Sequence, residues 1–380
     1  MRAAVYRRFG GPDVVQIDEV ATPEPGPDEI LIRVHATTVS AADHRSRARD
    51  IPRGLTLPSS LVLGFRRPKR PVLGMDAAGV VAAVGSEIDE FSVGDEVVAM
   101  LGSRFGGHAE YAIAAKGDAI VHKPRALDFA AAASIVFGGI TAQAFLNQVD
   151  VRKGTRVLVN GASGAVGASV VQLAAAVGAH VTGVTSAANS EMVRSLGAQR
   201  TIDYAEHDFS ADGCVYDVVV DCVGNAPVRR IRASVARGGA VLLIAGDLRS
   251  LLLARRDARR YGITVVTAPG RYRAEDLKHV FQLAEEGVLR PTIDRVYSFD
   301  DIAEAHRYVD TGRKRGSVVV QVCEALAAGP LGAPLSGLSG VPVGCDVRAR
   351  SRSCRGRAVR RSIGRPPARR RAGTCGRWPG

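Results

Sequence analysis

The chain has 380 residues, of which 46% are hydrophobic and 23% are charged, so it can form two domains of about 150 residues, each with its own core. The net charge is +13, but the segment after Cys323 holds twelve arginines, no lysine and two acids, which leaves +3 for residues 1–323. This balance excludes the domain-wide basic surface of a nucleic-acid-binding fold. No apolar run reaches the roughly 18 to 20 residues of a membrane helix. The N-terminus has no apolar signal segment, so we expect a cytoplasmic protein.

The first part of the chain alternates short apolar stretches with turn sequences, which predicts a β-rich domain. The expected strands cover residues 3–6, 14–17, 30–34, 79–84, 95–100 and 110–113. Residues 46–70 interrupt this pattern with prolines and basic side chains. We expect a short helix there, within an excursion on the substrate side.

From Pro124 the hydrophobic period becomes that of helices alternating with strands. Asp128 can cap a helix over residues 129–135, and the glycines within 137–142 predict a break before a second helix that ends near Asn147. Later strands are expected at 157–159, 180–185, 217–221, 240–244 and 263–267, with a helix at 190–196. This alternation predicts a doubly wound parallel sheet with helices on both faces.

The last third of the chain changes character twice. Helices are expected at 274–286 and 300–310, followed by a closing strand at 316–322. Beyond residue 323, Ala, Gly, Pro, Ser and Arg dominate without any period, which predicts a disordered tail. The arginines of this tail could contact RNA or acidic lipids; its composition also fits translation through an altered reading frame.

The most specific motif is the glycine turn, which we define as residues 160–167. It follows an apolar strand and leads into an alanine-rich helix. Glycines let the backbone approach a diphosphate that would be repelled by a Cβ atom, and the helix N-terminus attracts the negative charge. We therefore predict that the cofactor-binding residues include Gly161, Ala162, Ser163, Gly164, Ala165, Val166 and Gly167.

Several further motifs occur together with this turn. They are residues 72–76 with 79–85, 93–97, 137–142, 194–198, 202–204, 217–224 and 315–319. With these motifs, residues 1 to about 322 resemble the zinc-free branch of the medium-chain dehydrogenase/reductase superfamily, the quinone oxidoreductase or zeta-crystallin type. The resemblance implies an α/β fold with a GroES-like β-rich catalytic domain over 1–125, completed by 269–323, and a Rossmann cofactor-binding domain over 126–268. The Arg-rich tail would cover 324–380.

The resemblance also implies the chemistry. Members of this type reduce quinones, enones or alkenals with NADPH, and many dimerise through their cofactor domains. In the zinc-dependent branch, metal ligands stand where this chain has Ser40 and Met75, which are poor zinc ligands. No CxxC pair is present either, so we expect no metal site.

The choice of cofactor depends on the residues after the second strand of the parallel sheet. An NAD site usually has an acidic residue there, whereas this chain reads Thr185-Ser-Ala-Ala-Asn189, which favours NADP. The resemblance suggests that Ser186 and Tyr204 contact the 2′-phosphate, although Ala188 and Asn189 stand where a basic residue is often found. Further cofactor contacts are expected from Thr141, Val223, Gly224, Ala245, Gly246 and Arg315.

The candidate catalytic residues are Ser40 and Asp43, which the resemblance places in the cleft. Asp43 can instead cap the segment that follows it. The leading hypothesis is a zinc-independent NADPH reductase of quinones or α,β-unsaturated carbonyls, acting by direct hydride transfer on a small electrophilic substrate. The alternatives are an NADP-dependent alcohol or aldehyde oxidoreductase and a nucleotide-binding interaction protein with little turnover.

Overall fold

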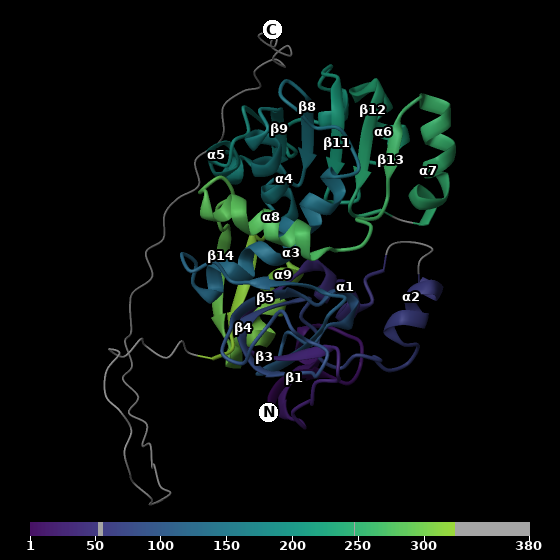
Figure 1. Ribbon diagram of the computed structural model, residues 1–380. Helices are drawn as coiled ribbons and strands as arrows, with labels where there is room; N and C mark the ends of the chain where they lie inside the picture. The colour runs from purple at the N-terminus through teal and green to yellow at the C-terminus, as the bar shows by residue number, and fades with distance from the viewer. Residues whose placement is uncertain (52–55, 247, 324–380) are drawn as a thin grey trace, which may run out of the picture. The chain divides into compact units, whose positions relative to one another are not determined.

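The computed structural model describes residues 1–51, 56–246 and 248–323. The disorder expected for residues 324–380, and any contact that they make with RNA or lipid, lie outside these residues. Two large sheets carry the described part of the chain (Figure 1). A seven-stranded sheet lies in the lower half of this view and a six-stranded sheet in the upper half.

The seven-stranded sheet joins strands from both ends of the described chain. The N-terminal strands are β1 (Arg2–Tyr6), β2 (Val15–Glu19), β3 (Glu29–Val39), β4 (Asp76–Val84), β5 (Glu96–Met100), β6 (Tyr111–Ala115) and β7 (Ala119–His122). β1 and β2 pair separately, and the others combine with β14 (Ile293–Ser298) and β15 (Ser317–Gln321) in the order β14-β15-β3-β4-β5-β7, with β6 beside β3. The expected β-rich part and closing strand are present, whereas β7 and β14 were not predicted. The domain boundaries stay a prediction.

The six-stranded sheet is parallel and has the Rossmann arrangement. Its strands are β8 (Arg156–Asn160), β9 (His180–Thr185), β10 (Arg200–Asp203), β11 (Tyr216–Asp221), β12 (Val235–Leu243) and β13 (Thr264–Val266). The order β10-β9-β8-β11-β12-β13 reverses direction beside β8, which creates the crevice where doubly wound sheets bind ligands. Its helices are α4 (Ala165–Ala176), α5 (Ser190–Ser195), α6 (Val228–Ile231) and α7 (Leu248–Tyr261). The predicted doubly wound sheet is thus confirmed.

The helix break expected within residues 137–142 is wrong. A single helix, α3 (Phe129–Leu146), runs through this segment, capped by Asp128, which accepts from the Ala131 amide at 2.7 Å. A Cβ added to Gly138 would lie 2.6 Å from the Ala165 carbonyl oxygen, and one added to Gly139 would lie 2.6 Å from Val280. These glycines therefore let α3 pack closely against the start of α4 and against α8 (Ala274–Glu285), instead of ending the helix.

Helix α3 also corrects the expectation that no apolar segment reaches the length of a membrane helix. It has 18 residues and a mean hydropathy of 1.7, so by length and composition it could cross a membrane. However, 72% of it is buried within the fold, and its residues Ile135, Val136 and Ile140 belong to the largest core cluster. Helix α3 is thus the central core helix of the described chain.

Three further helices belong to the part of the chain that carries the seven-stranded sheet. They are α1 (Ala41–Ala48), α2 (Thr56–Leu63) and α9 (Ile302–Asp310), and α2 confirms the short helix expected within residues 46–70. Short 3-10 helices occur at Pro12–Val14, Gly102–Arg104, Ala187–Asn189, Phe209–Ala211, Arg232–Ser234 and Phe299–Asp301. Arg47 is fully buried, and its Nη2 donates to both carboxylate oxygens of Asp310 at 2.5 and 2.6 Å. This pair joins α1 to α9, and residues of both helices line the cavity described next.

Candidate functional site

A cavity of about 1000 Å³ lies at the carboxyl ends of the parallel strands. The cofactor half of the chain contributes the residues that follow four strands: Asn160, Gly161 and Ser163 to Gly167 after β8; Val184 to Ser186, Ala188 and Asn189 after β9; Tyr204 to Phe209 after β10; and Cys222, Val223 and Asn225 after β11. The other half of the wall is formed by Ala41, Phe137, Arg230, Val309 and Gly312 to Arg315. The cavity therefore occupies the crevice at the sheet's change of direction, where a dinucleotide is expected.

The glycine turn leaves one end of helix α4 open toward this cavity. Gly161 has a φ of +81°, a conformation that glycine adopts without strain. A Cβ on Gly167 would overlap the Gly161 carbonyl oxygen, whereas one on Gly164 would meet nothing nearer than that oxygen at 3.6 Å. Gly164 is the N-cap of α4, and no side chain caps the helix. The first amides of this 12-residue helix are thus available to an anion.

Asp221, at the end of β11, shapes the loop that forms the opposite wall. This carboxylate is 1% exposed. It accepts from the amides of Val223, Gly224 and Ala226 at 2.9 to 3.0 Å and from the Asn160 side-chain amide at 2.8 Å. Because Asp221 accepts four hydrogen bonds from strands β8 and β11 and their loops, it fixes the position of residues 222–226 beside the glycine turn.

Among the described residues, four Lys or Arg side chains line the cavity, and three of them were not predicted from the sequence. Arg230 follows β11, and Arg313, Lys314 and Arg315 come from the loop between α9 and β15. Arg230 pairs with Asp208 at 2.9 Å. The side chains of Arg313 and Arg315 make no hydrogen bond or ion pair with any residue that the structure describes. Only Arg315 was predicted, because the other positions carry no local motif.

The loop that carries these cations is bonded directly to the glycine turn. The Gly316 amide donates to the Ser163 carbonyl oxygen at 2.7 Å, and Gly164 forms an isolated parallel bridge with Gly316. The Lys314 ammonium donates to the Gly316 carbonyl oxygen at 2.8 Å. Burial lowers the pKa of Lys314 to about 8, although Asp294 opposes this shift. Positive charge therefore lies close to the open helix end.

Cys222 is the cavity thiol, and its surroundings keep it protonated. Burial raises its pKa well above the ordinary range, and the neighbouring Asp221 carboxylate raises it further. A thiol of this kind holds little thiolate at neutral pH. We therefore assign Cys222 to the cavity wall and not to nucleophilic chemistry.

Ten of the predicted cofactor residues line the cavity: Gly161, Ser163, Gly164, Ala165, Val166, Gly167, Ser186, Tyr204, Val223 and Arg315. Five others do not line it, namely Thr141, Ala162, Gly224, Ala245 and Gly246. Ala162 is fully buried beneath the turn. Thr141 lies on α3 beside Tyr272, with 3.3 Å between their hydroxyl oxygens. A Cβ on Gly224 would lie 2.6 Å from the Ala245 carbonyl oxygen, so these two residues pack closely against each other.

Ser40 and Asp43 form the capping box of helix α1. The Ser40 hydroxyl donates to Asp43 Oδ2 at 2.6 Å and accepts from the amides of Ala42 and Asp43. The other Asp43 oxygen accepts from the Gly74 amide at 2.9 Å. Both side chains are buried, and Ala41, which lies between them in sequence, lines the cavity. The pair therefore holds the end of α1 at the cavity wall, and a direct catalytic role stays a prediction.

Together, the Rossmann sheet, the open glycine turn and the cations form a site with the features of a dinucleotide-binding site, next to the β-rich N-terminal part of the chain. Residues 26–125 match the family model described as alcohol dehydrogenase GroES-like domain, and residues 196–320 match the one described as zinc-binding dehydrogenase. The chain is similar to the chloroplastic quinone-oxidoreductase QR1 of Triphysaria versicolor, with 30% identity over 338 residues, which cover 84% of this chain and 98% of the relative.

Two further similarities agree with these matches. A chloroplastic NADPH-dependent alkenal/one oxidoreductase of Arabidopsis thaliana is 32% identical over 339 residues, covering 84% of this chain and 79% of the relative. The solved structure of a quinone oxidoreductase from Coxiella burnetii superimposes with a TM-score of 0.76 at 28% identity, covering 85% of this chain and 99% of that one. The chain belongs to the medium-chain dehydrogenase/reductase superfamily, in its quinone oxidoreductase type, and is an oxidoreductase.

Proposed function

We propose that this chain is a zinc-independent, NADPH-dependent reductase of quinones or α,β-unsaturated carbonyls. The observation that carries the proposal is a cavity lined both by the start of α4, with its uncapped amides, and by two arginines that have no partner among the described residues. Such a surface suits the diphosphate and the 2′-phosphate of NADPH. When bound, the reduced nicotinamide supplies a hydride. The relatives named quinone oxidoreductase and alkenal/one oxidoreductase support electrophilic acceptors.

NADPH is preferred over NADH because no acidic side chain stands at positions 185–189, at the end of β9. Thr185 and Ser186 occupy the place where a carboxylate would bind the ribose of NAD. Arg313 and Arg315 compensate for the uncharged Ala188 and Asn189 by supplying positive charge from another part of the chain. We assign the 2′-phosphate to these arginines together with Ser186 and Tyr204.

Replacing both Arg313 and Arg315 with alanine should weaken NADPH binding at least about tenfold, because charge-assisted hydrogen bonds to the 2′-phosphate would be lost. NADH, which lacks this phosphate, should bind with nearly unchanged affinity. Titration of both nucleotides by fluorescence measures the two dissociation constants. A matched control is Arg255→Ala/Arg256→Ala on α7, which removes the same charge away from the cavity. An equal loss for NADPH and NADH would contradict the assignment.

The pKa of Lys314 predicts how cofactor affinity depends on pH. Its pKa of about 8 means that the ammonium is charged at neutral pH and loses its proton as the pH rises through about 8. The dissociation constant of NADPH should therefore increase between about pH 7 and pH 9.5, because the positive charge beside the diphosphate disappears. The Lys314→Arg variant stays charged and should show a flat profile over this range. A parent chain with a flat profile would exclude Lys314 from cofactor binding.

Zinc independence rests on the donor atoms. The Ser40 hydroxyl is occupied within its capping box, and the thioether of Met75 replaces the imidazole of the zinc-dependent branch, so neither is a good Zn²⁺ ligand. Residues 1–51, 56–246 and 248–323 contain no group of three or more His, Cys, Asp or Glu side chains that could hold a metal ion. Without a Lewis acid to polarise it, the acceptor must already be electrophilic.

The chain's residues then act mainly by placement. Ser40 and Asp43 are positioning residues that hold Ala41 at the cavity wall. Main-chain amides or a polar side chain stabilise the oxyanion that develops on the acceptor. The proton comes from water.

A homodimer fits this proposal because β13 is an edge strand within the described sheet, and edge strands can pair with a second copy. We also propose a cytoplasmic location, and for the globular part neither a membrane nor a nucleic acid as a partner.

The test is NADPH oxidation by chain truncated after Cys323, with EDTA present, against quinones, enones, alkenals and simple aldehydes. Turnover of quinones or enones that is insensitive to EDTA is the expected result. Turnover of aldehydes alone would favour the alcohol or aldehyde oxidoreductase. Tight NADPH binding without turnover of any acceptor would favour an interaction protein.

A further inference from the structure

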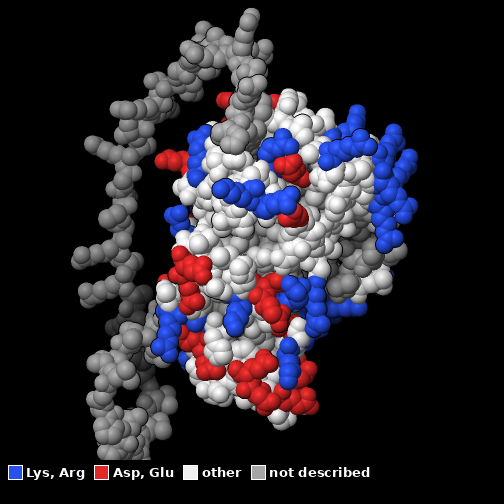
Figure 2. Space-filling model, turned by 45° about the horizontal axis from the view of Figure 1, so that its top comes forward, with Lys and Arg blue, Asp and Glu red and all other residues white. Residues whose placement is uncertain are grey.

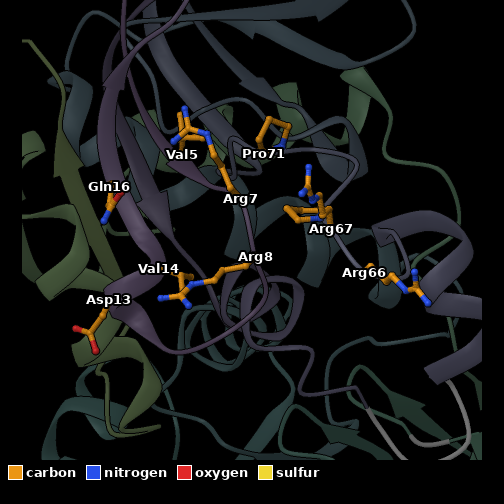
Figure 3. A pocket seen from close by; sticks show the side chains of 10 residues that line it. Val5, Arg7, Arg8, Asp13, Val14, Gln16, Arg66, Arg67 and Pro71 are labelled. Carbon is orange, nitrogen blue, oxygen red and sulfur yellow. The ribbon is translucent and has the colours of Figure 1, made fainter.

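A second pocket, of about 560 Å³, lies in the catalytic half and shares no lining residue with the cofactor cavity. It is formed between the β1–β2 hairpin and residues 66–71, the segment that leads toward β4. Figure 3 shows Arg7 and Arg8 between Asp13 and Val14 on one side and Arg66 and Arg67 on the other. Four arginines from two separate segments thus line one pocket.

Most of this charge is not neutralised. Arg7 pairs with Asp18, and Asp13, the acid in the pocket wall, pairs with Arg307. Within the described parts of the chain, the side chains of Arg8, Arg66 and Arg67 have no hydrogen bond, ion pair or ring contact. Three arginines without partners among the described residues therefore line the pocket, although residues 1–323 carry a net charge of only +3.

The backbone holds the two arginine segments side by side. The Tyr6 amide donates to the Pro71 carbonyl oxygen at 2.9 Å, and Val5 forms an antiparallel bridge with Val72. The pocket wall between the arginines is apolar and includes Val5, Val14, Pro68 and Pro71. A ligand that fits this pocket needs anionic groups for the guanidiniums and can place an organic body against the apolar wall.

We propose that this pocket binds a small phosphorylated organic molecule carrying at least two phosphate charges. Guanidinium groups present paired donors that match phosphate oxygens, and they bind phosphate more specifically than a point charge does. The pocket volume lies within the range that accommodates small ligands. All four arginines are exposed, so the ligand exchanges with solvent without any opening of the fold.

Inorganic pyrophosphate is the probe that tests the site. Isothermal titration of the full chain, at about 150 mM salt and with NADPH in excess to fill the cofactor cavity, should show one pyrophosphate per chain. The Arg66→Ala/Arg67→Ala variant should lose at least about tenfold in affinity, because charge-assisted hydrogen bonds are removed. Since both side chains are exposed, circular dichroism should show an unchanged fold.

Two matched variants separate binding in this pocket from a general charge effect and from binding in the cofactor cavity. Arg255→Ala/Arg256→Ala removes two exposed arginines from α7, which lies under the group of basic side chains at the right edge of Figure 2; it should keep the affinity of the parent chain. An equal loss there would indicate a general charge effect and overturn the proposal. A loss confined to Arg313→Ala/Arg315→Ala would place pyrophosphate in the cofactor cavity and overturn it too. The proposal would also be overturned if the parent chain did not bind pyrophosphate at millimolar concentrations.

Discussion

Replacing Gly164 with valine is expected to abolish measurable NADPH binding while the fold keeps nearly all of its stability. The protein has room for the new side chain, because a Cβ at this position meets only the Gly161 carbonyl oxygen at 3.6 Å. Gly164 lines the cavity at the open end of α4, so the valine would occupy the space in front of the helix amides. Titration with NADPH and urea unfolding followed by circular dichroism measure both effects. The free energy of unfolding should fall by no more than about 1 kcal/mol.

Gly167→Ala is the matched control at the other end of the turn. A Cβ there would overlap the Gly161 carbonyl oxygen and lie 3.0 Å from the Ala162 Cα atom. This variant should lose about 1–3 kcal/mol of unfolding free energy, because the turn must move to admit a methyl group. The two glycines thus separate cofactor access from turn packing. A Gly164→Val chain that binds NADPH as tightly as the parent would show that the diphosphate does not lie against this turn.

Replacing Asp221 with alanine is expected to reduce the free energy of unfolding by more than about 3 kcal/mol. Four donors lose their acceptor: the amides of Val223, Gly224 and Ala226 and the side chain of Asn160. Each buried donor left without a partner costs about 1–3 kcal/mol, and water that enters the space recovers part of this. NADPH affinity should fall as well, because Val223 and Asn225 line the cavity. Urea unfolding and nucleotide titration provide the two measurements.

The Asp221→Asn variant tests whether the hydrogen bonds are the cause. Asparagine keeps one carbonyl oxygen as an acceptor for Val223 and Gly224, but its amide group would face the Ala226 N–H as a second donor. Its stability should therefore lie between that of the parent and that of Asp221→Ala. If both variants are as stable as the parent chain, Asp221 does not organise the loop.

Much of the fold could be predicted because its strands are continuous apolar runs between turn residues. Val157 to Val159 and Val218 to Val220 are buried in the parallel sheet, as such runs predict. The prediction of a helix break within residues 137–142 was wrong for a physical reason. Gly138 and Gly139 are needed for close packing between helices, and a single sequence does not distinguish a glycine that packs from a glycine that ends a helix. Strand β14 was missed because half of its six residues are polar or charged and do not alternate regularly with the apolar ones.

The residues of the candidate site also fall into two groups, those that the sequence predicted and those that it did not. The glycine turn is a local motif, so its residues could be assigned from their spacing, and most of them line the cavity. Arg230, Arg313 and Lys314 lie far from the turn in sequence and reach the cavity only through tertiary structure. Ala162 was predicted from the motif and Thr141 from the resemblance, yet both are buried and do not line the cavity. Contacts that depend on how distant segments meet cannot be read from local pattern.

The bond between Gly316 and Ser163 makes the nucleotide-binding half poorly transferable. Residues 156–266 contain the whole parallel sheet and the glycine turn, and they would be the natural segment to exchange between relatives by domain grafting. The loop with Arg313, Lys314 and Arg315 would stay behind, since it leads into β15 of the other sheet. A chimaera built this way would keep the diphosphate cradle and inherit the charge of its host's loop. If Arg313 and Arg315 hold the 2′-phosphate as proposed, nucleotide preference depends on both halves, and a graft must include residues 311–316 to carry it over.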